Sequence, residues 1–263
     1  MKRTLGVGGW ALGVALALTV SACAHSAPAD DIVRVAIQAA PISFDPRTAT
    51  DEQSQRVHQL VYDHLGALAA RLDNPDPLTC IVHLRHGVKF HDGHELSAKD
   101  VVYTFGSVLD PTMKSVTALD DHTVRLTLKD ATGSFPAQLA RHVVPDGGGD
   151  GLRTFPIGTG PYRFLRYVVG KQVEFVVFEG YWDGLPQNAG VTLRIIPDEA
   201  MRVRELRQGS ADIIINDANV AVTRPGVENV RLTPTAGFWT LKDVKKVAPY
   251  GPDRLGPSDA GGG

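Results

Sequence analysis

The stretch Leu84–Asp110 reads LRHGVKFHDGHELSAKDVVYTFGSVLD, and its turn signals predict the local structure around which the fold is organised. It starts at the end of a strand, turns at Gly87, continues as a short strand over Val88–His91 and turns again at Asp92-Gly93. The segment beyond the second turn enters a helix. The whole stretch therefore predicts a strand-turn-helix unit.

The helix in this stretch begins at a capping-box pattern. Ser97 is placed to cap the first turn, and Asp100, three residues later, is placed to return the hydrogen bond. An apolar face follows at helical spacing, made of Val101, Val102, Phe105, Val108 and Leu109. Periodicity alone indicates an amphipathic helix and no particular function.

The identities of the residues in the stretch carry more information than their periodicity. L-R-x-G-V-K-F-H-D-G, followed by an Ala-x-Asp-Val helix start, resembles the signature of the family 5 extracellular solute-binding proteins. These are the oligopeptide, dipeptide and nickel receptors of ABC importers. Two later stretches resemble the same family in the same order, PIGTGPYRF at Pro156–Phe164 and R-x-x-E-L-x-x-G-x-x-D-I at Arg202–Ile213. The resemblance extends from Ile32 to about Leu241.

The resemblance implies an α/β fold of the periplasmic-binding-protein-like type II class, in its peptide-receptor subclass. It implies a first lobe with an inserted subdomain, and a second lobe that is missing from this chain. We expect a main lobe at residues 32–46 and 155–235 and an inserted subdomain at residues 47–154. Residues 236–263 are expected to be a truncated crossover and a disordered tail, because the end of the chain is rich in glycine and proline.

Hydrophobic periodicity predicts the elements of these regions. The expected strands are residues 33–37, 116–119, 124–128, 162–168, 173–178, 191–196 and 211–214. The expected helices are residues 135–139, residues 198–208, and a helix that starts at a capping box of Thr50 and Gln53 and includes Val57, Leu60, Val61 and Leu65. Pro145–Gly151 is expected to be a flexible linker.

The start of the chain has the features of an exported precursor. Lys2 and Arg3 precede a short apolar run, Leu5–Val20, which ends in Val-Ser-Ala and then Cys23. This ending resembles a bacterial lipobox, which implies a signal peptide at residues 1–22, lipidation of Cys23 and a flexible tether at residues 23–31. The alternative is an ordinary secretory peptide that is cleaved elsewhere, in which case Cys23 is discarded.

Charge and cysteine content exclude some classes of function. The 263 residues carry a formal net charge of −2, so nothing indicates a nucleic-acid partner. If Cys23 is lipidated, Cys80 is the remaining thiol, and an intramolecular disulfide cannot form. A lone cysteine on a strand is most often a small core residue.

Four histidines crowd the signature and raise the question of a metal site. They are His83, His86, His91 and His94, with two H-x-x-H spacings. Their strand and turn positions do not indicate that the ring nitrogens converge, and no cysteine or glutamate cluster accompanies them at zinc-site spacing. We therefore expect no metal and no cofactor.

The resemblance implies a receptor and not an enzyme. Family members bind a solute between two lobes and deliver it to an ABC permease in the membrane. The partners expected here are a peptide or other small solute, that permease and the lipid anchor. The candidate substrate contacts are Ala39, Ala40, Pro41 and Ile42, in the loop after the first strand, and Phe238 and Trp239, near the crossover to the second lobe.

Other readings remain open at this point. The chain departs from the family pattern by shortenings after Leu65 and after Asp110-Pro111, and with the missing lobe these would also fit a receptor that has lost its function. An interaction or scaffold lipoprotein with an exposed half-cleft, or half of a split receptor, fits the same residues. A secreted hydrolase has little support, because Ser43 and Ser54 lie in no G-x-S-x-G motif and no H-E-x-x-H motif occurs.

Overall fold

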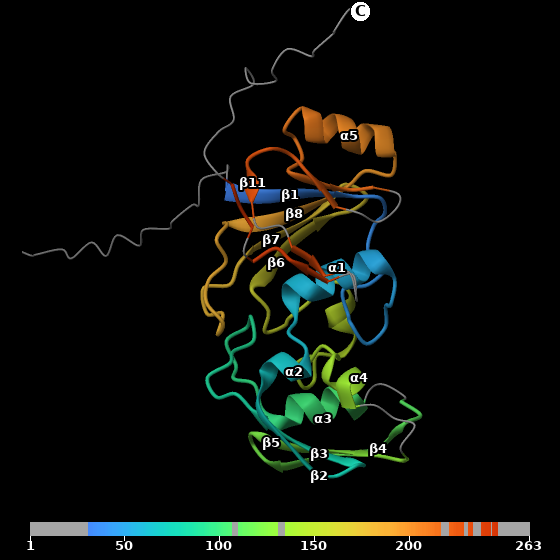
Figure 1. Cartoon of the computed structure of the whole chain (residues 1–263), viewed down its shortest axis with the longest axis vertical. Helices are drawn as coiled ribbons and strands as arrows, with labels where there is room; N and C mark the ends of the chain where they lie inside the picture. Colours follow the sequence, from blue (N-terminus) through green and yellow to red (C-terminus); the bar gives the residue numbers. More distant parts are fainter. Residues whose placement is uncertain are drawn as a thin grey trace, which may run out of the picture.

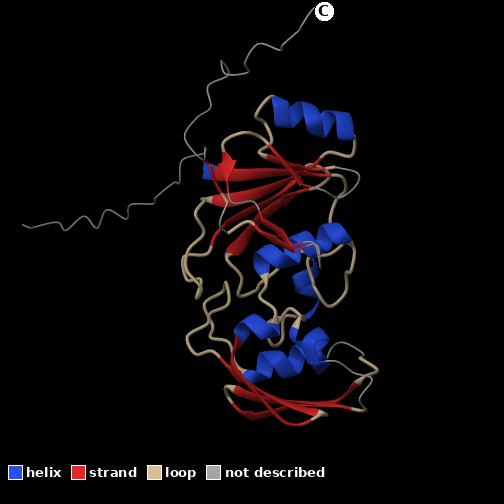
Figure 2. Ribbon diagram, in the orientation of Figure 1, coloured by secondary structure: helices blue, strands red, loops and turns tan. Residues whose placement is uncertain are grey.

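The computed structural model describes residues 31–106, 110–130, 135–216, 221–228, 231–233, 238–242 and 244–246. Figure 1 shows an elongated molecule with a larger sheet toward one end and a smaller sheet at the other, and Figure 2 shows helices between the two. Within the described ranges, no helix has the length and apolar character needed to span a bilayer. The architecture is α/β, as the sequence predicts.

The larger sheet has six strands in the order β10-β9-β1-β8-β7-β6. The strands are β1 (Ile32–Ile37), β6 (Tyr162–Val168), β7 (Gln172–Val177), β8 (Gly190–Ile195), β9 (Ile213–Ile215) and β10 (Ala221–Thr223). β1 pairs in parallel with both β8 and β9, and the other pairs are antiparallel. The carboxyl ends of the three parallel strands therefore meet at one edge of the sheet.

The central strand β1 is apolar because both of its faces are covered. Successive side chains of a strand point to opposite faces. Val33, Val35 and Ile37 are fully buried in the main hydrophobic core. Ala36 packs on the other face with Ile214 and with residues of helix α5 (Glu199–Arg207), which lies over the outer side of the sheet (Figure 1).

Helix α1 (Glu52–Val61) packs on the main core, but its start differs from the prediction. The carboxylate of Asp51 caps the helix by accepting the backbone N–H of Ser54 at 2.9 Å. The predicted capping box of Thr50 and Gln53 is therefore wrong by one residue. A carboxylate is favoured at this position because the helix N-terminus carries unpaired N–H groups and a partial positive charge.

The smaller sheet is antiparallel, in the order β2-β3-β5-β4. Its strands are β2 (Ala69–Asp76), β3 (Thr79–Leu84), β4 (Met113–Asp120) and β5 (Thr123–Leu128). Helices α2 (Leu65–Leu68), α3 (Ala98–Gly106) and α4 (Phe135–Leu139) lie on the side that faces the larger sheet (Figure 1). The predicted hairpin around residues 120–122 and the helix at residues 135–139 are confirmed.

Two elements of this region were not predicted. Leu65, expected at the end of the preceding helix, starts the separate helix α2. β2 was missed because it is an edge strand whose side chains are mostly exposed, so it lacks the apolar alternation of a half-buried strand.

The signature stretch forms the predicted turns and helix with two differences. Val88–His91 is not a strand, because the chain turns back at once and only Lys89 and Glu95 form an isolated bridge. Asp100 returns its hydrogen bond to the Ser97 N–H at 2.8 Å, but the Ser97 hydroxyl donates to the same carboxylate and does not cap the helix. Val108 and Leu109 lie outside the described residues.

The glycine-rich segment Pro145–Gly151 was expected to be a flexible linker and is instead bonded to α3. The backbone N–H of Gly149 donates to the Tyr103 hydroxyl at 3.0 Å, and that of Asp146 donates to Asp100 at 2.8 Å. A 3₁₀ helix, Gly149–Arg153, follows and buries Leu152 in the main core.

Two short two-stranded sheets follow the larger sheet. β11 (Val227–Glu228) pairs with β14 (Lys245–Lys246), and β12 (Arg231–Thr233) pairs with β13 (Phe238–Thr240). The segment after β13 joins the main core through Leu241 and Val244, which are buried. Part of the expected crossover at residues 236–263 is thus paired and packed, and residues 247–263 lie outside the described residues.

Candidate functional site

The loop after β1 leaves the sheet at the edge where the parallel strands end. Ligands of open α/β sheets bind beyond the carboxyl ends of the strands, where loops diverge. Ile37 at the end of β1 pairs with Ile195 at the end of β8, and its carbonyl accepts a hydrogen bond from the backbone N–H of Ile196. The loop formed by Ala39–Ile42 therefore has a position at which a ligand can be bound.

Helix α1 holds this loop in place. The Ser54 hydroxyl accepts the backbone N–H groups of Ile42, at 2.9 Å, and of Ser43, at 3.2 Å. The ring of His58 hydrogen-bonds the Ser43 carbonyl at 3.3 Å, and burial lowers the pKa of His58 to about 4. Ser54 is fully buried and Ser43 is 8% exposed, so neither hydroxyl is presented to solvent as a nucleophile would be.

The four predicted residues of the loop differ in their exposure. Ile42 is 80% exposed, so its large apolar side chain is open to solvent. Ala39 is exposed, Ala40 is half-buried and Pro41 is buried. Ala39, Ala40 and Ile42 are thus available for contact with a ligand, whereas Pro41 is buried inside the protein.

The other predicted site residues lie at the end of the chain or outside the described part. Phe238 and Trp239 lie in β13, where they pair with Thr233 and Leu232. β13 lies against α1, the helix that also holds the loop of Ala39–Ile42. Cys23 lies outside the described residues.

A buried carboxylate that was not among the predicted site residues joins three segments of the chain. Asp63 follows α1 and accepts hydrogen bonds from the Thr159 hydroxyl at 3.0 Å, the Trp182 indole N–H at 2.9 Å and the Tyr181 hydroxyl at 3.2 Å. Burial raises the pKa of Asp63 above its usual value, and these three hydrogen bonds oppose the shift. The sequence marked Pro156–Phe164 as a family segment, but no local pattern indicates that it shares one carboxylate with Tyr181 and Trp182.

Gly158 and Gly160 approach the end of α1 so closely that a side chain at either position would collide with it. The N–H of Gly160 donates to the Val61 carbonyl at 2.9 Å. A Cβ on Gly158 would lie 2.1 Å from that carbonyl oxygen. These glycines explain the PIGTGPY motif as a contact between two backbones.

The four histidines of the signature have separate surroundings. His83 pairs with Asp73 at 2.8 Å, and His94 pairs with Asp92 at 2.6 Å. His91 hydrogen-bonds the Gly160 carbonyl at 2.9 Å, and burial lowers its pKa to about 4. His86 instead lies beside His122, with ring centroids 4.0 Å apart.

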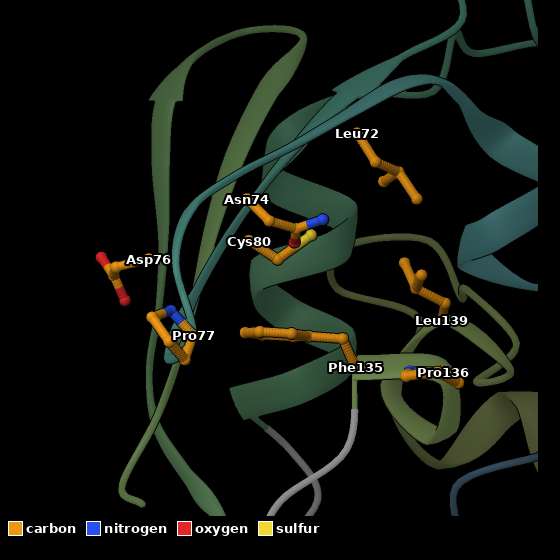
Figure 3. A pocket seen from close by; sticks show the side chains of 8 residues that line it. All are labelled: Leu72, Asn74, Asp76, Pro77, Cys80, Phe135, Pro136 and Leu139. Carbon is orange, nitrogen blue, oxygen red and sulfur yellow. The ribbon is translucent and has the colours of Figure 1, made fainter. Parts of the chain in front are cut away.

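A pocket of about 350 Å³ lies in the region of the smaller sheet, between the β2–β3 hairpin and α4 (Figure 3). It is lined mainly by apolar side chains, among them Leu72, Phe135 and Leu139. Cys80 is one of the lining residues and is 1% exposed, and burial raises the pKa of its thiol. This agrees with the expectation that Cys80 is a small core residue.

Comparison with known proteins identifies the family. Residues 65–242 match the model of the bacterial extracellular solute-binding proteins, family 5, middle part. The chain is 30% identical over 229 residues to heme-binding protein A of Haemophilus influenzae, with 67% of this chain and 42% of that protein covered. It is 30% identical over 254 residues to di/tripeptide-binding protein 2 of Pseudomonas aeruginosa, with 76% and 47% covered.

A solved structure agrees with these matches. The oligopeptide-binding protein AppA of Bacillus subtilis, in complex with a nonapeptide, superposes with a TM-score of 0.66 at 26% identity, covering 71% of this chain and 44% of AppA. The chain spans less than half of the length of these three relatives. Because the family model matches more than half of the chain, and the fold agrees, the chain belongs to the family 5 bacterial extracellular solute-binding proteins.

Proposed function

We propose that this chain is part of the substrate-binding component of an ABC importer, and that it binds peptides or a similar solute. The observation that carries the proposal is the loop of Ala39–Ile42, which combines an exposed apolar side chain with a rigid anchor to α1. The names of the relatives mention heme, di/tripeptides and a nonapeptide, so the solute class is broad among similar proteins.

Peptide chemistry suits this loop. Ala39 and Ala40 have small side chains, so an extended ligand can approach the main chain and hydrogen-bond to it as an added strand does. Ile42 offers an apolar contact for a ligand side chain, and β13 with Phe238 and Trp239 adjoins the same helix. These three features support binding of a solute along the edge of the larger sheet.

We propose a division of the chain close to the one that the resemblance implies, which is a main lobe at residues 32–46 and 155–235 and an inserted subdomain at residues 47–154. The packing of α1, Val144 and Leu152 in the main core favours boundaries after Tyr62 and before Val144. In receptors of this kind a second lobe closes on the ligand by a hinge motion, and the ligand selects the closed state.

The proposed setting is outside the cytoplasm, beside the permease of the importer. A lipid on Cys23 would hold the chain at the membrane, with the residues up to Asp31 as a tether. One acyl chain binds membranes marginally, whereas several give a stable anchor.

An interaction role is the second candidate, because an exposed apolar side chain such as that of Ile42 can also contact another protein. In that case the apolar loop meets another polypeptide, such as a separately encoded second lobe. Without a facing lobe, the loop leaves one side of a ligand in water, where each hydrogen bond contributes only about 1 kcal/mol. The chain by itself is then expected to bind small peptides no more tightly than millimolar.

Titration of the isotope-labelled chain, followed by NMR, tests these candidates. Di- to octapeptides, glutathione and heme are added separately. Shifts confined to Ala39–Ile42 and β13, saturating at millimolar concentrations, support the proposal. Micromolar binding would show that the chain alone is a working receptor, and shifts elsewhere would contradict the assignment of the site. Absence of any shift, together with binding to a second-lobe polypeptide, would favour the interaction role.

A further inference from the structure

A group of metal-ligating side chains lies beside the smaller sheet, away from the loop of Ala39–Ile42. His86, Glu95 and His122 each offer one ligand atom, and these atoms all lie within 4.8 Å of one another. The three residues come from three separate segments: the turn after β3, the bridge residue before α3 and the β4–β5 turn. We propose that they form a binding site for a borderline divalent cation such as Zn²⁺.

The backbones that carry the three ligands are fixed to one another. The N–H of Leu84 donates to the His122 carbonyl at 2.8 Å, and the N–H of Ala98 donates to the Asp121 carbonyl at 2.8 Å. The N–H of Gly87 donates to the Glu95 carboxylate at 2.8 Å. These bonds tie all three segments together, so the ligands are preorganised on rigid backbone.

The distances suit a metal ion after small side-chain rotations. Two atoms that each lie about 2.1 Å from an ion are at most about 4.2 Å apart. Nε2 of His122 and Oε1 of Glu95 are already 3.9 Å apart. In a tetrahedral site the ligand atoms lie about 3.4 Å apart, so the present separations must shorten by about 0.5–1.4 Å. His86 and Glu95 are exposed, so their side chains can rotate by this amount without displacing core atoms.

An ion pair between His122 and Glu95 does not account for the cluster. Nε2 of His122 lies 3.9 Å from Oε1 of Glu95, which is longer than a hydrogen bond. An imidazole nitrogen without a proton holds a lone pair that binds metals, and a cation between this nitrogen, His86 and Glu95 would join all three groups.

The donor set indicates which cations fit. Two imidazole nitrogens and one carboxylate suit Zn²⁺, Ni²⁺ or Cu²⁺, with water in the remaining positions. Ca²⁺ and Mg²⁺ prefer oxygen ligands, so they are expected to bind weakly. The expectation of no metal weighed the four histidines of the signature, and His122, which is distant from them in sequence, was not among them.

Calorimetry of the untagged, metal-free chain with Zn²⁺ tests the proposal. We expect one Zn²⁺ per chain with micromolar affinity, and at least tenfold weaker binding in each of His86→Ala, Glu95→Gln and His122→Ala. Variants His83→Ala and His94→Ala, which change neighbouring histidines outside the cluster, serve as matched controls and should retain the affinity.

A second measurement keeps the test independent of folding defects. Co²⁺ bound by this donor set should give visible absorption bands that disappear in His86→Ala and Glu95→Gln, both of which change exposed side chains. Absence of binding at 0.1–1 mM Zn²⁺ would overturn the proposal, because the binding free energy would then be weaker than about 4–6 kcal/mol. Binding that survives the cluster variants, or that is lost in His83→Ala or His94→Ala, would also overturn it.

Discussion

Gly160 donates its backbone N–H to the carbonyl of Val61 at 2.9 Å, and a Cβ on Gly160 would lie 2.6 Å from the carbonyl carbon of that residue. Two segments about 100 residues apart therefore touch through their backbones. This contact positions α1, which in turn holds the loop of Ala39–Ile42. The stability of the molecule and the geometry of its candidate site depend on the same pair of residues.

Gly160→Ala should destabilise the chain by about 1–3 kcal/mol, because the added methyl group forces the two backbones apart. Chemical denaturation monitored by circular dichroism measures the change. Gly151→Ala is the matched control, since a Cβ there meets no atom within 4 Å, and its effect should stay within about 0.5 kcal/mol. Equal effects of the two substitutions would contradict the close-approach argument.

Asp63→Asn should lower the free energy of unfolding by about 1–3 kcal/mol, because the amide presents N–H groups to donors that need an acceptor. Trp182→Phe removes one of the three donors and should cost less. The exposed carboxylate of Asp150 gives a control, and Asp150→Asn should be nearly neutral. A double-mutant cycle between Asp63 and Trp182 that gives no coupling would contradict the proposed role of the carboxylate.

The stability of the chain should fall as the pH decreases from about 6.5 to about 4. The ring of His58 is buried and binds a proton only near pH 4 when folded, whereas in the unfolded chain it binds one near pH 6.5. Acid therefore favours unfolding between these values, by at most about 1.4 kcal/mol per pH unit for this residue. His58→Gln should flatten the dependence of the unfolding free energy on pH, and an unchanged slope would show that His58 does not contribute.

Ile42→Asp should weaken solute binding with little effect on stability. Its side chain is 80% exposed, so the substitution removes an apolar contact for the ligand without opening the core. Val169→Asp is the matched control, because Val169 is 81% exposed in the turn between β6 and β7. NMR titration with the same peptides compares the two variants, and equal loss of binding would place the site elsewhere.

Cys23→Ala should release the chain from membranes into the soluble fraction if Cys23 carries lipid. Several acyl chains give a stable anchor, and the substitution removes the sulfur that would carry them. Fractionation and labelling with a fatty acid measure the outcome. Wild-type chain that takes up no label would contradict lipidation and favour an ordinary secretory peptide.

Local sequence was sufficient where the structure depends on neighbouring residues. The turn at residues 120–122 and the helix that begins at Ala98 follow from alternation and spacing within a few positions. The three family motifs identified the fold, because their order along the chain reflects one architecture. The cap of α1 was misplaced by one residue, since Thr50 and Asp51 are both good candidates and only the folded backbone selects between them.

Only the tertiary structure revealed the contacts that join distant segments. The sequence by itself determined the α/β class, the family motifs and the loop after β1. It could not indicate that Asp63 binds Thr159, Tyr181 and Trp182, or that His86 meets His122 and Glu95. The physical reason is that periodicity reports which side of an element is buried, whereas a hydrogen bond or a metal site depends on atoms that packing brings together from separate elements.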